Sequence, residues 1–152
     1  MWNESSILIV TKVVKLKNLA ISDFYKRLKA PLANIQWSWG AQAEDGTVIL
    51  RGWLHEVRKI DGKYQYLVLD DSWNDTSPLG YAERIKHLKL IEEGAKIRIV
   101  SMIVKDATQQ IPHIKQYKSD ALMIGTKIIR DGTLTYVEVD GIEKLTNGYR
   151  QG

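Results

Sequence analysis

The amino-acid sequence predicts a single α+β domain built on a small, mostly antiparallel β-barrel with one or two helices. Three Asp-Gly pairs each join two strand-like stretches, at positions 45–46, 61–62 and 131–132. Such pairs favour tight hairpins because both residues accept the positive φ of a two-residue turn. A helix is expected over residues 80–93, ended by Gly94 as a left-handed cap. The 152 residues suffice for one packed domain, with a lead-in over residues 1–33 and the barrel over residues 34–140.

The lead-in contains one β-branched run and one short helical pattern. Residues 5–14 favour a strand, although so short an apolar run also fits a helix. Ser22 is expected to be the N-cap of a helix of two turns that Pro31 ends. Phe24 and Leu28 are four residues apart, so they would dock this helix through one side.

The first three barrel strands are expected over residues 35–40, 47–58 and 64–70. A two-residue turn at Asp45-Gly46 would place Trp39 opposite Gly52. This register gives one apolar face that forms the core, comprising Ile35, Trp37, Trp39, Val48, Leu50, Leu54, Leu67 and Leu69. The opposite face carries Gln36, Ser38, Arg51, Trp53, His55, Tyr64, Tyr66 and Asp70. A one-residue bulge at either turn would instead move the tryptophans of the first strand to this second face.

The second half of the chain supplies the elements that would complete the barrel. A polar loop over residues 72–80 leads into the helix, whose expected apolar face consists of Tyr81, Ile85, Leu88 and Ile91. A strand over residues 95–105 follows, then a polar connection around Pro112 and the last hairpin. The tail over residues 148–152 is expected to fray.

Two stretches of the sequence resemble OB-fold domains. Residues 48–71 (VILRGWLHEVRKIDGKYQYLVLDD) resemble the opening of the OB domains that bind tRNA anticodons in class II aminoacyl-tRNA synthetases. The matching positions are Gly52, Trp53, Arg58, Gly62, Tyr66 and Asp71, while Asp70 stands where that family has arginine. Residues 83–104 resemble the helix, glycine and strand that complete such domains. The resemblance implies an OB-type barrel that binds nucleic acid, and a small mixed barrel of the PUA type is the alternative fold.

The polar face of the predicted sheet is the candidate binding surface. Its Arg51, Trp53, His55 and Tyr66 interleave rings with cationic groups, as surfaces that stack single-stranded bases do. Phosphate contacts are expected from Arg58 and from one helix edge, which carries Tyr81, Arg84 and His87. The competing interpretation is that the amino-terminal segment, the last hairpin or a helix buries this face and that the helix edge is only solvated. We therefore expect a non-catalytic protein that binds single-stranded, distorted or modified DNA or RNA.

Composition narrows the class of protein. Cysteine is absent, which excludes disulfides and thiolate metal sites and fits a reducing compartment. The net charge of +4 is compatible with a nucleic-acid partner. No apolar run is long enough to span a bilayer, and the early apolar run lacks the basic start and the cleavage site of a signal peptide. A cytoplasmic location without membrane association is therefore expected. No cofactor is expected either.

Two other functions stay open on the sequence alone. Asp70, Asp71 and Asp75 are close in sequence and could hold a divalent cation, as in a metal-dependent nuclease or phosphoester hydrolase of a restriction or defence system. The adjacent pair Asp70 and Asp71 would point to opposite sides of a strand, which weakens a shared site. The second alternative is a protein-interaction module that uses a barrel edge or the basic helix.

Overall fold

The computed structural model describes residues 19–104 and 114–151, and for residues 114 and 115 it describes the backbone alone. The strand expected at residues 5–14 and the connection around Pro112 lie outside these residues. The described elements are α2 (Ile21–Arg27), β1 (Gly40–Gln42), β2 (Val48–Trp53), the 3-10 turn η1 (Leu54–Glu56), β3 (Val57–Ile60), β4 (Lys63–Asp70), α3 (Trp73–Thr76), α4 (Pro78–Glu92), β5 (Ile97–Val104), β6 (Ile114–Tyr117), β7 (Ala121–Asp131), β8 (Leu134–Thr146) and β9 (Tyr149–Arg150).

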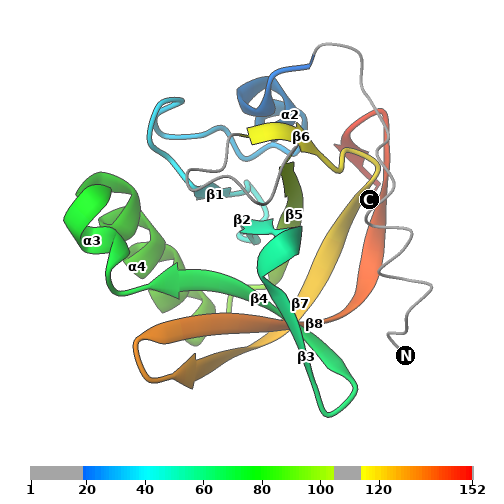
Figure 1. The fold of residues 1–152 in the computed structure, drawn as a ribbon. Coiled ribbons are helices and arrows are strands. Elements are labelled where there is room, and N and C mark those ends of the chain that lie inside the picture. The colour runs from blue at the N-terminus through cyan, green and yellow to red at the C-terminus, as the bar shows by residue number, and fades with distance from the viewer. Residues whose placement is uncertain (1–18, 105–113, 152) are drawn as a thin grey trace.

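The described strands form one mixed, mostly antiparallel sheet, which confirms the α+β class. Its order is β1-β2-β5-β7-β8-β4-β3, with β6 added beside β5 and β9 beside β8. The pairing of β2 with β5 is parallel, and the other described pairings are antiparallel. The strand expected over residues 47–58 is interrupted by η1, so β2 and β3 are consecutive stretches of chain at distant places in the strand order. Figure 1 shows the sheet strongly bent, with α3 and α4 together on one side of it.

The two Asp-Gly turns of the first half differ in register. At the second turn Val57 pairs with Tyr66, as predicted, and Asp61 and Gly62 both have positive φ, at 51° and 79°. At the first turn Ala41 pairs with Ile49, one residue away from the predicted partner. The amide of Gly46, which has a φ of 91°, donates to the Ala43 carbonyl at 2.9 Å. The loop therefore has three residues and ends in a left-handed glycine, which is the bulged alternative.

The prediction of a strand over residues 35–40 is wrong, because residues 35–37 form a turn and β1 begins at Gly40. Two hydrogen bonds close this turn: Ser38 N donates to the Asn34 carbonyl, and Asn34 N donates to Ser38 Oγ, each at 2.9 Å. Ile35, expected in the core, is 71% exposed. The alternation of apolar and polar residues in this stretch therefore does not reflect a strand, because the chain forms a local turn instead.

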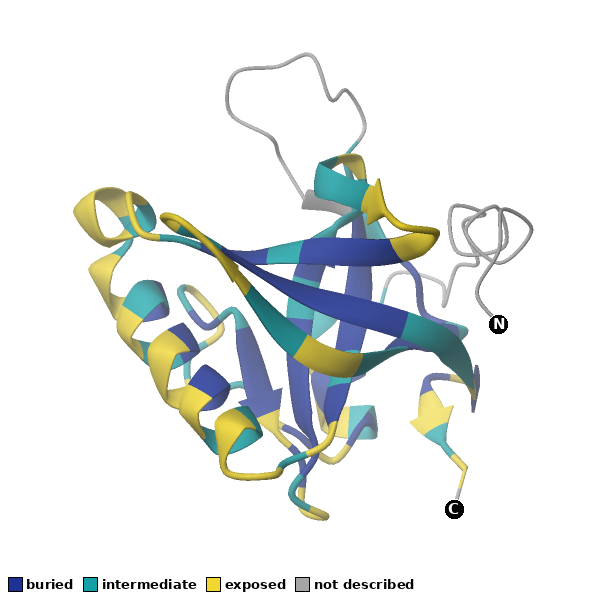
Figure 2. Cartoon of the chain, turned by 90° about the horizontal axis from the view of Figure 1, so that it is seen from below, coloured by how far each residue is buried: buried dark blue, intermediate teal, exposed yellow. Residues whose placement is uncertain are grey.

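The helices also differ from their predicted ends and faces. Helix α2 begins at Ile21 after Ala20, so Ser22 is not its N-cap, although Phe24 and Leu28 are buried as expected. The short helix α3 was predicted as a loop. In α4 the buried positions are Gly80, Arg84, His87 and Leu88. Of the predicted apolar face, Leu88 is buried and Tyr81 and Ile91 pack partly buried against the first core, but Ile85 is 41% exposed. Figure 2 shows this buried side of α4 turned toward the strands. None of the helices in the described ranges has the length and apolar character needed to span a bilayer.

Strand β2 separates two hydrophobic cores. Val48 and Leu50 point into the first core, while Ile49 points into the second, where it meets α2. Tyr64 and Tyr66, which were predicted on the polar face, belong to the first core and are 6% and 0% exposed. The Tyr66 ring packs over Gly52, where a Cβ would lie 2.6 Å from the Tyr66 Cδ2 atom. The glycine therefore makes room for Tyr66, and the predicted pairing of Trp39 with Gly52 is not formed because the register is shifted by one residue.

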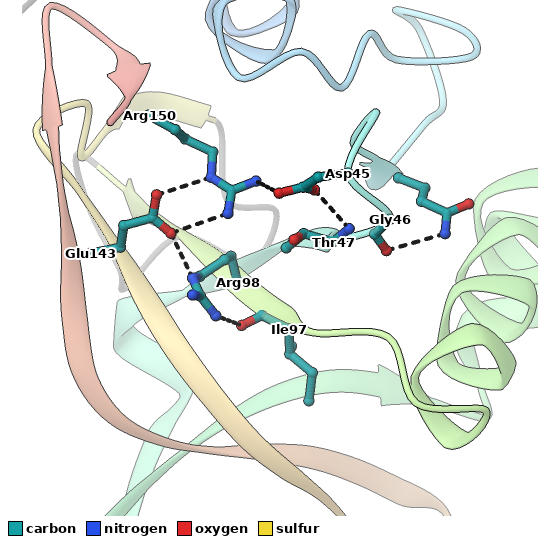
Figure 3. Close-up of polar contacts among 8 residues, drawn as sticks. Asp45, Gly46, Thr47, Ile97, Arg98, Glu143 and Arg150 are labelled. Carbon is teal, nitrogen blue, oxygen red and sulfur yellow. Dashed lines mark hydrogen bonds and ion pairs between the residues drawn. The ribbon is translucent and has the colours of Figure 1, made fainter. Parts of the chain in front are cut away.

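The carboxyl-terminal tail is anchored through Arg150, so the prediction that residues 148–152 fray is wrong for this part of it. Arg150 Nε lies 2.9 Å from Glu143 Oε2, and its Nη1 lies 3.2 Å from Asp45 Oδ2 (Figure 3). Arg98 Nε binds the other oxygen of the same glutamate at 2.7 Å. Burial raises the pKa of Glu143, but the bonds from Arg150 and Arg98 outweigh it and hold the pKa below its usual value. This network joins β5, β8 and β9 to the first turn.

Candidate binding pocket

A hollow of about 520 Å³ lies between β2, the turn before β1, the start of α2 and the α3–α4 junction. Its size is within the range of small-molecule sites, about 300–1,000 Å³. Three tryptophans and two arginines contribute to its wall. The lining residues are Ile21, Ile35, Gln36, Trp39, Arg51, Trp53, Leu67, Trp73, Thr76, Ser77, Arg84 and Met102.

Trp39 is held from both its backbone and its ring. Its amide donates to Glu83 Oε1 at 2.9 Å, and Glu83 Oε2 accepts the hydroxyl of Ser38 at 2.7 Å. A Cβ placed on Gly80 would lie 2.6 Å from the Trp39 Nε1 atom, so the absence of a side chain there lets the indole lie against α4. The ring of Trp73 meets it edge-on, with centroids 5.6 Å apart and planes at 85°. The two indoles therefore form a fixed corner of the pocket.

Arg84 forms part of the pocket wall and is only 2% exposed. Its guanidinium donates to the Trp39 carbonyl at 2.8 Å and to the Val68 carbonyl, and its Cζ atom lies 5.7 Å from the Trp39 ring centroid. Burial lowers the pKa of Arg84 to about 10, so the side chain stays charged at neutral pH. Its main structural role is to connect β1, β2 and β4 to α4. A surface contact to phosphate, as the sequence suggested, does not fit this position.

Arg51 reaches the same pocket from β2. One Nη2 hydrogen is donated to the Ser38 carbonyl. Within the described part of the chain, the other N–H groups of this guanidinium have no hydrogen-bond partner. Burial lowers the pKa of Arg51, whereas Tyr25 and the carboxylate of Glu83 act in the opposite direction. Arg51 therefore brings a positive charge and unused donors to the hollow.

Trp53 lines the pocket at the end of β2, and His55 follows it on η1. The two rings lie 5.8 Å apart with planes at 59°, and His55 is exposed. The two rings are close although the strand ends at η1, between Trp53 and His55. In a continuous strand they would share a face because they are two residues apart. Arg51, Trp53 and His55 thus remain together, as the sequence predicted.

The other predicted site residues lie elsewhere. Tyr66 is buried and its hydroxyl is 2.8 Å from Ser101 Oγ, which removes it from any surface. Arg58 lies over the ring of Tyr136 at 3.5 Å and forms an ion pair with Asp131 on another hairpin.

On α4, the hydroxyl of Tyr81 donates to Asp71 Oδ1 at 3.2 Å. His87 is 9% exposed, and burial lowers its pKa. Its Nδ1 atom has no hydrogen-bond partner within the part of the chain that the structure describes. Neither side chain lines the pocket.

Sequence reasoning missed two of the three pocket tryptophans. Trp39 was expected in the core; it does pack against the first core, and it also lines the pocket, as the bulged register would have indicated. Trp73 was not predicted as a site residue because it lies in a stretch of polar residues that is typical of a loop. No local pattern could have indicated that Gly80, forty-one positions after Trp39 in the chain, makes room for that ring.

The described residues contain no group of three or more His, Asp or Glu side chains placed to hold a metal ion. Asp70 Oδ1 accepts from the backbone and hydroxyl of Ser72 at 2.9 and 2.8 Å, while Asp71 accepts from Tyr81. The structure therefore gives no support to the alternative of a cation site at Asp70, Asp71 and Asp75.

Comparisons with protein-family models, with curated proteins and with solved structures found no significant match. The functional assignment consequently depends on the chemistry of the pocket.

Proposed function

We propose that this protein binds nucleic acid without catalysis, by receiving one unstacked base in the pocket of Trp39, Trp53 and Trp73. The observation that carries the proposal is the hollow of about 520 Å³ that combines three indoles with the guanidinium of Arg51. A base needs flat apolar walls for its faces and polar groups for its edge, and this pocket offers both.

Stacking on aromatic side chains contributes about 1–3 kcal/mol per base, and this is the main attractive term expected here. A base inside a duplex cannot reach a pocket unless it is extruded, which costs a few kcal/mol, least for a mismatched or unpaired base. Single-stranded or distorted nucleic acid is therefore the favoured partner. His55, exposed beside Trp53, is placed to contact the strand at the pocket mouth.

The positive charge of the chain supports the same partner class. The net charge is +4, and Arg51 brings one of these charges to the pocket wall. Arg58 and Arg84 are not part of the proposed interface, because Arg58 pairs with Asp131 and Arg84 is buried against backbone carbonyls. The proposed interface consists of Trp39, Arg51, Trp53, His55 and Trp73.

We also propose that the bent sheet is a barrel of the PUA or OB type. Two features support this: β2 and β3 are joined by only three residues, and the strands between them in the sheet order are β5, β7, β8 and β4. The parallel pair β2–β5 is closer to the mixed PUA type. The fold alone does not imply a function, so the binding proposal depends on the pocket.

The test is a titration with single- and double-stranded DNA and RNA at two salt concentrations, followed by tryptophan fluorescence. Single strands are expected to bind more tightly, and the affinity should fall as salt rises because phosphate contacts release counterions. Trp53→Ala should weaken binding about tenfold or more. Trp37→Ala is the matched control, because Trp37 is half-buried and lies outside the pocket wall.

Binding that Trp53→Ala leaves unchanged would rule out the pocket as the site. An affinity for the oligonucleotides that does not depend on salt would contradict the phosphate contacts that the proposal includes. Arg130→Ala serves as a charge control, because it removes one positive charge from an exposed side chain on a distant hairpin. Its effect should be smaller than that of Arg51→Ala.

A further inference from the structure

The polar groups in the pocket wall are mostly hydrogen-bond donors. The guanidinium of Arg51 and the three indole N–H groups can only donate, whereas the Nη groups of Arg84 already donate to the carbonyls of Val68, Trp39 and Arg51. Among the described residues, the side chains in the wall that can accept are Gln36, Thr76 and Ser77, and none of the described carboxylates lines the hollow. Glu83, whose charge acts on both arginines, already accepts from Ser38 and Trp39. A ligand that fits this wall must present acceptors.

The two arginines also exclude a cationic ligand, although tryptophan-lined cages often bind quaternary ammonium groups. The guanidinium of Arg84 already lies 5.7 Å from the Trp39 ring centroid, where it makes the cation–π contact itself. The positive charge of Arg51 also disfavours the charged form of Arg84, so a third cation in the same space would be repelled.

Arg51 presents a fork rather than a single donor. Nη2 gives one hydrogen to the Ser38 carbonyl, which leaves its second hydrogen and both hydrogens of Nη1 without partners among the described residues. Two parallel donors of this kind match two adjacent acceptors in one plane. Among purines, guanine offers such a pair in O6 and N7, whereas adenine replaces O6 with a donating amino group.

We propose that the pocket selects guanine, with Arg51 as the residue that reads O6 and N7 while the indoles stack on the double ring. This inference rests on the proposed function, since it names the base that the same pocket receives. The donor-rich wall disfavours adenine because the amino group of adenine would face other donors and remain unpaired. The purine ring system is also favoured over a pyrimidine because it offers more area to the three indoles.

The experiment compares short oligothymidylates that carry one central guanine, inosine, 7-deazaguanine or adenine, with the all-thymine strand as baseline. Guanine and inosine both retain O6 and N7, so they should bind within about threefold of each other. The 7-deazaguanine strand lacks N7 and the adenine strand lacks O6, so each should bind about tenfold more weakly. Because these arms change only the ligand, they test the proposal on the unaltered protein.

Arg51→Lys tests the fork without removing the charge. The variant should lose the preference for guanine over adenine while its salt dependence stays close to that of the unaltered protein. Thermal unfolding of the variant, followed by circular dichroism, checks that it is folded. Arg130→Lys is the matched control and should keep the full guanine preference.

The outcomes separate this inference from the proposed function. Equal binding of the guanine, inosine, 7-deazaguanine and adenine strands, together with a loss of binding in Trp53→Ala, would overturn the guanine preference and leave base binding intact. A guanine preference that persists in Arg51→Lys would overturn the role of Arg51. If none of the strands binds at either salt concentration, the proposed function itself fails.

Discussion

The first and second Asp-Gly turns have the same dipeptide and different geometries. At 61–62 the aspartate itself adopts positive φ, and the strands keep a two-residue register. At 45–46 the Asp45 carboxylate accepts the Thr47 amide at 3.0 Å and pairs with Arg150, and the loop takes a third residue. The turn whose aspartate has a tertiary partner is therefore also the turn whose register differs by one residue from the two-residue hairpin.

That shift has a consequence for the site. The first hairpin leads into the pocket, because the backbone amide of Arg51 on β2 donates to the Trp39 carbonyl at 3.1 Å. Figure 1 shows the turn between β3 and β4 at the opposite end of the molecule from α2 and β1. Arg58 near this turn is engaged with Asp131 and Tyr136, and of this hairpin's strands only β4 reaches the pocket wall, through Leu67, among the described residues. One hairpin therefore belongs to the proposed interface and the other is structural.

The largest expected difference between the two regions comes from their arginines. Arg84→Met should lower the free energy of unfolding by about 2–3 kcal/mol, because it leaves buried carbonyls of Trp39 and Val68 without a donor. Arg58→Met should cost about 1 kcal/mol or less, since its ion pair is partly exposed. Urea unfolding measures both values, and equal losses would contradict the contrast between a buried and a surface arginine.

Gly80→Ala tests how tightly the Trp39 side of the pocket is packed. In an open helix position this change would stabilise by about 0.5–1 kcal/mol. Here the new Cβ would lie 2.6 Å from Trp39 Nε1, so we expect a net loss of about 1–2 kcal/mol together with weaker oligonucleotide binding. Thermal unfolding and the fluorescence titration report the two effects, and a stabilised variant with unchanged binding would show that the indole moves freely.

Gly46→Ala and Gly62→Ala compare the two turns directly. Both glycines have positive φ, at 91° and 79°, and open space around them, so each change should cost about 1–2 kcal/mol of strain. Only Gly46→Ala should also weaken oligonucleotide binding, because the first turn sets the position of β1 and β2 at the pocket. Equal effects on binding would mean that the register of the first hairpin does not control the site.

The smallest expected effect is the pH dependence of the first turn. The amide of Thr47 lowers the pKa of Asp45, so its stabilising effect is present above the unfolded pKa and is lost as the pH falls through the folded pKa, below about 4. Asp45→Asn should therefore reduce the acid-induced loss of stability seen by thermal unfolding. An acid-induced loss in Asp45→Asn equal to that of the unaltered protein would contradict this role of the Thr47 amide.

The elements that were predicted correctly depend on local chemistry. The second hairpin, the last hairpin and the ending of α4 before Gly94, whose φ is 113°, follow from turn residues that need no distant partner. Arg51 and Trp53 line the same hollow, as expected for residues two apart in a strand, which share a face. Neither prediction required knowledge of the tertiary contacts.

The parts that could not be predicted depend on contacts between distant residues. Glu83 binds the Trp39 amide and the Ser38 hydroxyl across more than forty positions, and this holds the chain out of the expected strand. Arg84 was expected on a solvated helix edge because charged residues are usually exposed. Its burial is possible because carbonyls from β2 and β4 and from the residue before β1 accept its hydrogens, and no local pattern encodes that arrangement.

The most direct measurement of the central claim is a two-dimensional NMR titration that follows the indole N–H signals with a guanine-containing single strand. The indole signals of Trp39, Trp53 and Trp73 should shift together with one affinity, while that of Trp37, outside the pocket wall, should remain in place. Shifts confined to Trp37, or binding that leaves the three pocket indoles unmoved, would contradict the assignment of this pocket as the site that receives a base.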